Sequence, residues 1–205
     1  MTKLLLVRHG HVEGISPERF RGRAELPLTE LGRREAEMTA ACIAASWRPA
    51  AIYTSPMGRC VDTGAAIAKP FGLSSSAMGG LNDIDYGEWQ GLTTDEARAR
   101  WPGELDTWHR HPDWAAIPGG ESLQQVLARA VAALRDVIQR HPDDTVVLVA
   151  HDSVNRVLLL HALELPLARY WHLKQSPCAI NEVDFGEGGF IIHSVNQTDH
   201  LREQT

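Results

Sequence analysis

Two histidines in this chain each stand at the end of a run of apolar residues, one after an intervening arginine. His9 follows Leu4-Leu5-Leu6-Val7-Arg8, and His151 follows the segment 145–150. Short apolar runs of this kind predict buried strands, and open α/β sheets bind ligands beyond the carboxyl ends of their strands. An imidazole at such a place can attack an electrophile or carry a proton near neutral pH. Each histidine could also belong to a surface loop or cap a helix. Whether the two form a site depends on which other side chains the fold brings beside them.

Arginines supply the first partners. Arg8 directly precedes His9, and Arg59 begins a predicted helix, 58–68, that follows another predicted strand, 50–54. Guanidinium groups offer a rigid fork of donors for phosphate or carboxylate. A helix start attracts anions and disfavours a cation unless something negative lies nearby. Three strand ends thus bring imidazoles and cations to one edge of the sheet, which predicts a site for a dianion such as phosphate.

A loop rich in glycine, proline and charge, 11–28, follows the first strand. It carries Arg21 and Gly22 in a cluster of arginines that could be a solvated surface or the rim of the anion pocket. We include both residues among the candidate substrate-binding positions.

The chemistry of a phosphate monoester fits these residue types. Two arginines and a histidine can hold the phosphoryl oxygens while a second histidine acts as the nucleophile. The leaving alkoxide then needs a proton from a carboxylic acid. Asp83, Asp85 and Glu88 are the candidate acids, all in one loop. This chemistry needs no metal or other cofactor.

Strands and helices alternate along the chain, which predicts the α/β class. We expect a three-layer sandwich: a mainly parallel central sheet with helices on both faces and an antiparallel edge hairpin formed by 179–185 and 190–195. Residues 1–205 form a single domain in this interpretation, with a small helical excursion at about 91–119 covering the ligand edge.

Capping boxes mark two helix starts, Thr93 with Glu96 and Ser122 with Gln125. In the predicted helix 30–46, four residues spaced by three, four and seven predict the apolar face: Leu31, Met38, Cys42 and Ala45. The last ten residues are polar, and we expect them to fray.

The composition narrows the class of protein. The formal net charge is −6 for 205 residues, which argues against general binding to nucleic acid or to an anionic membrane. Three scattered cysteines form no CxxC pair and fit a reducing cytoplasm. We also expect no membrane span and no signal peptide. The His109-Arg110-His111 segment is a weak metal candidate, because its histidines point in different directions.

Six motifs occur in one order along nearly the whole chain: Arg8-His9-Gly10, Pro27-Leu28-Thr29-Glu30-Leu31-Gly32, Tyr53-Thr54-Ser55-Pro56-Met57-Gly58-Arg59, Gly87-Glu88-Trp89-Gln90-Gly91, Pro118-Gly119-Gly120-Glu121-Ser122 and Val149-Ala150-His151. Together they resemble the histidine phosphatase superfamily, in its phosphoglycerate-mutase-like branch. The resemblance implies that His9 is the phosphorylated nucleophile. It also implies that Arg8, Arg59 and His151 form the phosphate pocket, and that Asp83 is the general acid.

Some positions depart from the family pattern. Asp83 replaces a glutamate and is one methylene shorter, so either the backbone lies closer or Glu88 assists. Ile15 replaces an asparagine that donates to phosphate, and His11 replaces a glutamate. Asp152 stands where many members have glycine, and an acid there opposes a dianion unless it points away.

The sequence therefore predicts a cytoplasmic, metal-independent phosphatase that hydrolyses a small phosphorylated metabolite through a phosphohistidine. The alternatives are a phosphoryl transfer of the phosphoglycerate mutase type, a non-catalytic module that binds a phosphorylated ligand and a metal-dependent hydrolase. A homodimer is possible, and the sequence leaves the substrate open.

Overall fold

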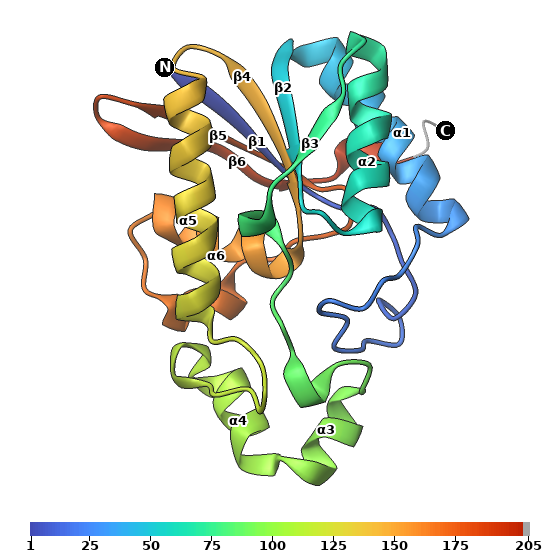
Figure 1. Ribbon diagram of the computed structural model, residues 1–205, viewed down its shortest axis with the longest axis vertical. Helices are drawn as coiled ribbons and strands as arrows, with labels where there is room; N and C mark the ends of the chain where they lie inside the picture. Colours follow the sequence, from blue (N-terminus) through green and yellow to red (C-terminus); the bar gives the residue numbers. More distant parts are fainter. Residues whose placement is uncertain (203–205) are drawn as a thin grey trace.

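The computed structural model describes residues 1–202 and contains a six-stranded sheet in the order β3-β2-β4-β1-β5-β6 (Figure 1). The strands are β1 (Thr2–Arg8), β2 (Pro49–Thr54), β3 (Ser75–Ala77), β4 (Thr145–Ala150), β5 (Ile180–Gly186) and β6 (Gly189–Gln197). The pairs β1–β4, β2–β4 and β2–β3 are parallel, whereas β5 runs antiparallel to both β1 and β6. This confirms the mainly parallel sheet and its antiparallel edge hairpin.

Helices cover both faces of the sheet. Helices α1 (Glu30–Ser46) and α2 (Gly58–Ala68) lie on one face, and α5 (Leu123–Arg140) and α6 (Asp152–Ala162) on the other (Figure 1). Successive side chains of a strand point to opposite faces. Leu5 and Val7 of β1 therefore join the α1–α2 core, while Leu4 and Leu6 join the α5–α6 core. All four side chains are buried, and full burial of one such side chain stabilises the fold by about 1.5–3 kcal/mol.

The face of α1 that packs on the sheet differs from the prediction. Its buried residues are small or β-branched: Gly32, Ala36, Thr39, Ala40 and Ile43. Leu31 is 45% exposed and Ala45 is exposed, so the predicted stripe was wrong at these two positions, whereas Met38 and Cys42 are half-buried and Cys42 packs against the core. The first turn of α1 lies so close to the loop after β1 that a glycine, and no large apolar residue, fits there.

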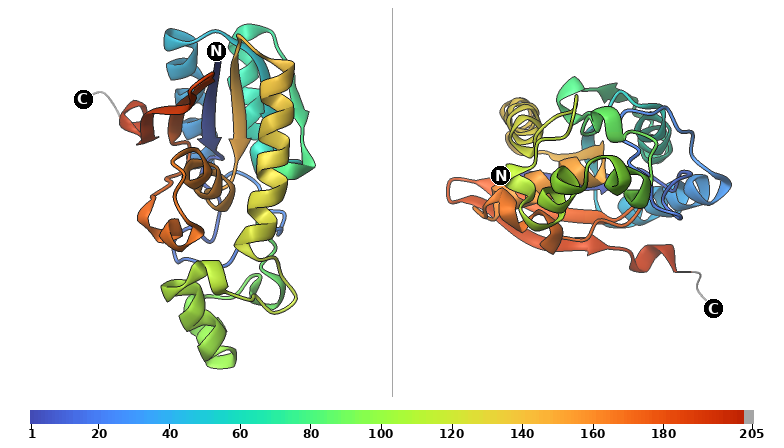
Figure 2. Two further views of the ribbon diagram at one scale, coloured as in Figure 1. Left: turned by 90° about the vertical axis from the view of Figure 1, so that its left-hand side faces the viewer. Right: turned by 90° about the horizontal axis from the view of Figure 1, so that it is seen from below.

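The segment 91–119 forms a helical excursion beyond the carboxyl ends of the central strands (Figures 1 and 2). It contains α3 (Thr94–Arg100), α4 (Pro102–Arg110) and a 3₁₀ turn (Pro112–Trp114). The predicted capping boxes at the starts of α3 and α5 are both present. Leu105 and Trp108 of α4 are buried in the same apolar cluster as the α5–α6 side of the sheet. The excursion thus shares its core with the sheet that it covers.

The end of the chain is more ordered than predicted. Strand β6 continues to Gln197, and Asp199–Leu201 form a 3₁₀ turn. The backbone N–H of Asn196 donates to the Oδ1 of buried Asn181 at 2.8 Å, which anchors this end of β6. The prediction of fraying was wrong for these residues, and 203–205 lie outside the described part. None of the described helices has the length and apolar character to cross a membrane.

Candidate active site

The register between β1 and β4 brings the two predicted histidines together. Arg8 is the partner of Ala150 in this parallel pair, so the next residue on each strand is a histidine. The backbone N–H of His9 donates to the carbonyl of Ala150 at 3.0 Å, which extends the pairing by one step. The two imidazole rings lie 5.2 Å apart between centroids and are 1% exposed. The strand-end prediction is confirmed for both residues.

The glycine after His9 allows the chain to turn beneath α1. A Cβ on Gly10 would lie 2.4 Å from the carbonyl oxygen of Gly32, and one on Gly32 would lie 2.1 Å from that of His11. Neither backbone oxygen can move aside like a flexible side chain. The two glycines therefore let the loop after β1 and the first turn of α1 touch.

The imidazole of His9 has a defined tautomer. Its Nδ1 lies 2.7 Å from the carbonyl oxygen of Gly10, and because a carbonyl only accepts, Nδ1 carries the proton. The lone pair of the neutral ring is then on Nε2. Burial, together with His151, Arg8 and Arg59, lowers the pKa of His9 well below its ordinary value. At neutral pH the ring of His9 is thus neutral and fixed in orientation, and its Nε2 lone pair is available to act as a nucleophile.

Two buried arginines lie beside the histidines. The Nη2 of Arg59 donates to the carbonyl of Gly22 at 2.7 Å, and its Nη1 donates to that of Ala24 at 2.8 Å. Arg8 donates to the carbonyl of Gln175, which follows the 3₁₀ segment Leu167–His172. The Nε atoms of both arginines are buried without a hydrogen-bond partner among the described residues. An oxyanion held between them would satisfy such donors, whose burial alone is costly.

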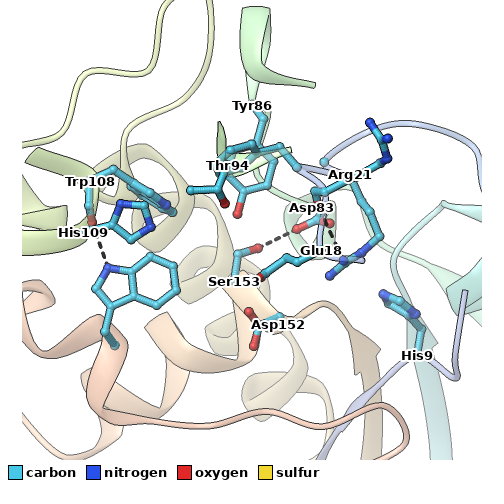
Figure 3. A pocket seen from close by; sticks show the side chains of 14 residues that line it. His9, Glu18, Arg21, Asp83, Tyr86, Thr94, Trp108, His109, Asp152 and Ser153 are labelled. Atoms are coloured by element: carbon cyan, nitrogen blue, oxygen red, sulfur yellow. Dashed lines mark hydrogen bonds between the residues drawn. The ribbon is translucent and has the colours of Figure 1, made fainter. Parts of the chain in front are cut away.

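Asp83 joins these groups through both carboxylate oxygens. Its Oδ2 lies 3.1 Å from the Nη2 of Arg59 and 3.4 Å from the Nδ1 of His151. Its Oδ1 accepts from the hydroxyl of Ser153 at 2.6 Å and from the N–H of Ile84 at 2.9 Å (Figure 3). Asp83 is the predicted acid that the structure brings into contact with the arginine and histidine pair.

His151 is oriented by a serine whose role the sequence did not reveal. The hydroxyl of Ser55 is hydrogen-bonded to Nε2 of His151 at 2.8 Å and accepts the N–H of Met57. The Nδ1 of His151 faces the Asp83 carboxylate, which only accepts, so the ring proton is on Nδ1 and Nε2 accepts the hydrogen of the Ser55 hydroxyl. Burial and the charges of Arg59 and Arg8 lower the pKa of His151 well below its ordinary value. The contact with Asp83 is therefore one between a neutral ring and a carboxylate.

A cavity of about 210 Å³ opens in front of His9 and Asp83 (Figure 3). Its other lining residues come from the loop 11–28, from the loop that contains Asp83, from the excursion, and from the start of α6 and the segment after it: Glu18, Arg19, Phe20, Arg21, Gly22, Tyr86, Thr94, Trp108, His109, Asp152, Ser153 and Trp171. Both predicted loop residues, Arg21 and Gly22, thus lie in its wall. The sequence had located these segments but not the individual aromatic and hydroxyl groups.

Other sequence candidates lie away from this cavity. Glu88 is exposed, close to the turn at Gly119, and Asp85 pairs with Arg23. His11 bonds to the hydroxyl of Thr29, the N-cap of α1. Asp152, in contrast, lines the cavity and does not point away from it. Among residues 1–202, no three histidine, cysteine, aspartate or glutamate side chains are grouped to hold a metal ion.

Two buried histidines, two buried arginines and a carboxylate meet beyond the carboxyl ends of the central strands, and such a set of groups can bind and transfer a phosphoryl group. The chain belongs to the histidine phosphatase superfamily (branch 1), whose family model matches residues 4–198.

Similar proteins include phosphatases of known name. Phosphoserine phosphatase 1 of Hydrogenobacter thermophilus is 30% identical over 203 residues, covering 99% of this chain and 96% of that protein. The metal-independent phosphoserine phosphatase of Arabidopsis thaliana is 29% identical over 203 residues, covering 98% of this chain and 84% of that protein. Among solved structures, Bacillus stearothermophilus YhfR superposes with a TM-score of 0.93 at 28% identity, covering 98% of this chain and 100% of that one.

Proposed function

We propose that this phosphatase hydrolyses small phosphate monoesters without a metal ion, through a phosphohistidine formed at Nε2 of His9. The observation that carries the proposal is the buried cluster of His9, His151, Arg8 and Arg59. His9 lines the cavity together with Asp83, whose carboxylate contacts both Arg59 and His151. Relatives named as phosphoserine phosphatases, one of them named metal-independent, support this reaction and substrate class.

In the first step the phosphoryl group of the ester lies between Arg8, Arg59 and His151. The Nε2 lone pair of His9 forms the N–P bond as the P–O bond to the leaving alkoxide breaks. The phosphate dianion binds together with one proton, which is taken up by the Asp83 carboxylate beside it. The alkoxide takes this proton from Asp83 and leaves as an alcohol. The arginines hold the charge spread over the equatorial oxygens, and they do so from fixed, water-poor positions.

In the second step a water molecule attacks the phosphorus of the phosphohistidine. The N–P bond breaks, a proton of the water passes to Asp83, and inorganic phosphate leaves. The neutral ring of His9 is restored with its Nδ1 proton still directed at the carbonyl of Gly10. Gly22 contributes through its carbonyl, which fixes Arg59, and Arg21 contributes a cation to the cavity wall.

The test is hydrolysis of p-nitrophenyl phosphate in the presence of a chelator, together with capture of the phosphoenzyme. We expect activity without added metal and an acid-labile phosphate on a peptide containing His9. The His9→Ala variant should lose both, and the His161→Ala variant on the outer part of α6 should keep both. Loss of activity on chelation, or undiminished activity of His9→Ala, would contradict the mechanism.

A further inference from the structure

The loop that carries Asp83 is attached to the side of α5. After β3 the chain forms a 3₁₀ turn, Gly79–Leu81, which contacts α5 before the chain reaches Asp83 (Figure 1). A Cβ on Gly80 would lie 2.7 Å from the Cβ of Ala133 and 2.7 Å from the carbonyl oxygen of Arg129. The turn and the helix backbone are therefore in direct contact. We call residues 79–85 the acid loop.

One side chain of α5, that of Arg129, holds the acid loop. Its Nη1 donates to the carbonyl oxygens of Gly80 at 3.0 Å and of Asn82 at 2.5 Å, and its Nη2 donates to that of Asp83 at 2.9 Å. Its Nε and Nη2 also donate to the two carboxylate oxygens of Glu121, at 3.0 and 2.9 Å. A guanidinium has five N–H groups. Each of them has an acceptor here, and three of the five acceptors are carbonyls of the acid loop.

Glu121 fixes the same loop further along the chain. Its Oε2 accepts the backbone N–H of Asp85 at 3.0 Å, and its own backbone N–H donates to the carbonyl of Asp85 at 2.9 Å. The same Oε2 pairs with the Nη2 of Arg23 at 3.1 Å, and the Nε of Arg23 donates to the carbonyl of Asp83 at 3.4 Å. The carbonyl of Asp83 is thus bound by two arginines that share one carboxylate.

The side chain of Asp83 extends from this backbone toward the catalytic groups. Its carboxylate contacts Arg59 and His151 and lines the cavity. Arg129 is not among the residues of the described chain that line that cavity. It acts on the reaction only through the backbone that it holds. Aspartate is the shorter of the two acidic side chains, so the place that its carboxylate reaches depends directly on where that backbone lies.

We infer that Arg129 is a positioning residue for the reaction: by holding the acid loop against α5, it places the Asp83 carboxylate where it can give its proton to the leaving alkoxide. The inference rests on the proposed phosphatase function. A misplacement of about 1 Å can cost on the order of 10²-fold in rate, even when the altered residue is remote from the chemistry. A lysine at this position would keep the positive charge, but its single nitrogen lacks the planar fork that binds the carbonyls and the carboxylate together.

A purely structural role would also account for Arg129. Its ion pair with Glu121 is largely buried, and loss of that pair would destabilise the fold and lower every rate alike. Its charge acts on the site as well: after burial and the charges of Arg59 and Arg8, Arg129 is a further cause of the low pKa of His151. The experiment must therefore keep the charge and separate proton donation from folding.

The variant Arg129→Lys and two esters make that separation. We expect kcat for propyl phosphate, whose alkoxide needs a proton to leave, to fall about 10- to 100-fold. The p-nitrophenolate burst from p-nitrophenyl phosphate, which needs no proton, should fall less than about threefold. Both are measured at a temperature at which circular dichroism shows the variant to be folded. An equal fall for the two esters would overturn the inference while leaving the phosphatase function intact.

The matched control is Arg140→Lys, also in α5. The Nε of Arg140 donates to Oδ1 of Asp136 at 2.9 Å, in an ion pair whose two side chains are exposed. This variant should hydrolyse both esters at the wild-type rates. If Arg129→Lys does not fold, Glu121→Gln serves in its place, because it keeps the shape of the side chain but leaves one oxygen to accept the donors of Arg129. It should show the same difference between the esters.

Amide hydrogen exchange gives a result that does not depend on hydrolysis. The N–H of Ile84 donates to Oδ1 of Asp83 at 2.9 Å, so its exchange reports the position of the carboxylate. In Arg129→Lys this exchange should accelerate about tenfold relative to the slowest amides of β1 and β4, which report global unfolding. If the wild-type protein hydrolysed neither ester, the proposed function would fall and this exchange would decide the inference. Acceleration at Ile84 relative to the strands would support it, and no relative change would overturn it.

Discussion

Replacing Asp83 by asparagine separates its acid–base role from its electrostatic role. The amide has nearly the same shape and keeps an acceptor for the hydroxyl of Ser153, but it cannot donate a proton to a leaving alkoxide. Arg59, which is fully buried, loses the carboxylate at 3.1 Å and keeps the carbonyls of Gly22 and Ala24.

The magnitudes follow from these contacts. Removing one partner of a buried ion pair costs about 3–5 kcal/mol, and the two retained carbonyls place Asp83→Asn near the lower figure. General acid catalysis is worth about 10²–10⁴-fold for a poor leaving group, so kcat for an alkyl phosphate should fall by that factor. For p-nitrophenyl phosphate, whose phenolate leaves without a proton, phosphoenzyme formation should fall by less than about tenfold.

The assay combines stopped-flow measurement of the p-nitrophenolate burst with steady-state hydrolysis of an alkyl phosphate. Urea unfolding measures the loss of stability. Because a negative charge has left the pocket, inorganic phosphate should bind the variant more tightly than the wild type. If the burst and the alkyl ester rates fell by the same factor, Asp83 would not act as the general acid, and Glu88→Gln would then be the next variant to measure.

Three further predictions concern the support of the site. In Gly10→Ala the new Cβ would lie 2.4 Å from the Gly32 carbonyl oxygen, and urea unfolding should show a free energy of unfolding lower by about 3 kcal/mol or more. In the control Gly103→Ala the new Cβ has open space around it, and the free energy of unfolding should not fall. Ser55→Ala removes the hydrogen-bond partner of His151 Nε2, and kcat/KM for p-nitrophenyl phosphate should fall about tenfold. In the control Ser46→Ala, at the exposed end of α1, kcat/KM should be unchanged. Burial lowers the pKa of His9 and of His151 in the folded state, so below pH about 6.5 the unfolded chain binds more protons than the folded one. The free energy of unfolding should therefore fall as the pH falls below that value, by about 1.4 kcal/mol per pH unit for each histidine. Unfolding free energies from pH 7 to 5 should fall less steeply in His151→Gln, and parallel curves would contradict the assignment.

The sequence predicted those parts of the site that follow from strand ends. Buried apolar runs ending in Arg8-His9 and in His151 sufficed, because parallel strands have a common carboxyl edge. Arg59 followed from its helix start after β2. Ser55 and Ser153 could not be recognised in advance, because serine is common in turns and at helix starts for purely local reasons. Their roles depend on which side chain lies opposite, and only the fold determines that.

The face of α1 shows a second limit of sequence reasoning. Periodicity weighs side chains by hydrophobicity, and Leu31 outweighs Gly32 on any such scale. In the structure Gly32 is nevertheless the buried residue of the two, because the position that faces the loop after β1 has no room for a Cβ. The polar end of the chain shows the same limit. Asn196 and His200 are ordered by bonds to Asn181 and Thr39, contacts that composition alone does not predict.

The pairing of β1 with β4 also has a consequence for biosynthesis. Both histidines stand at the ends of these two strands, which are about 140 residues apart in the chain and yet immediate neighbours in the sheet. Contacts of such sequence separation slow folding, because a long loop must close before they are gained. A nascent chain therefore has no complete phosphate pocket until β4 has left the ribosome. Recovery of activity during refolding should report the closing of this central pair, and fragments that lack β4 should be inactive however much of the remaining chain they retain.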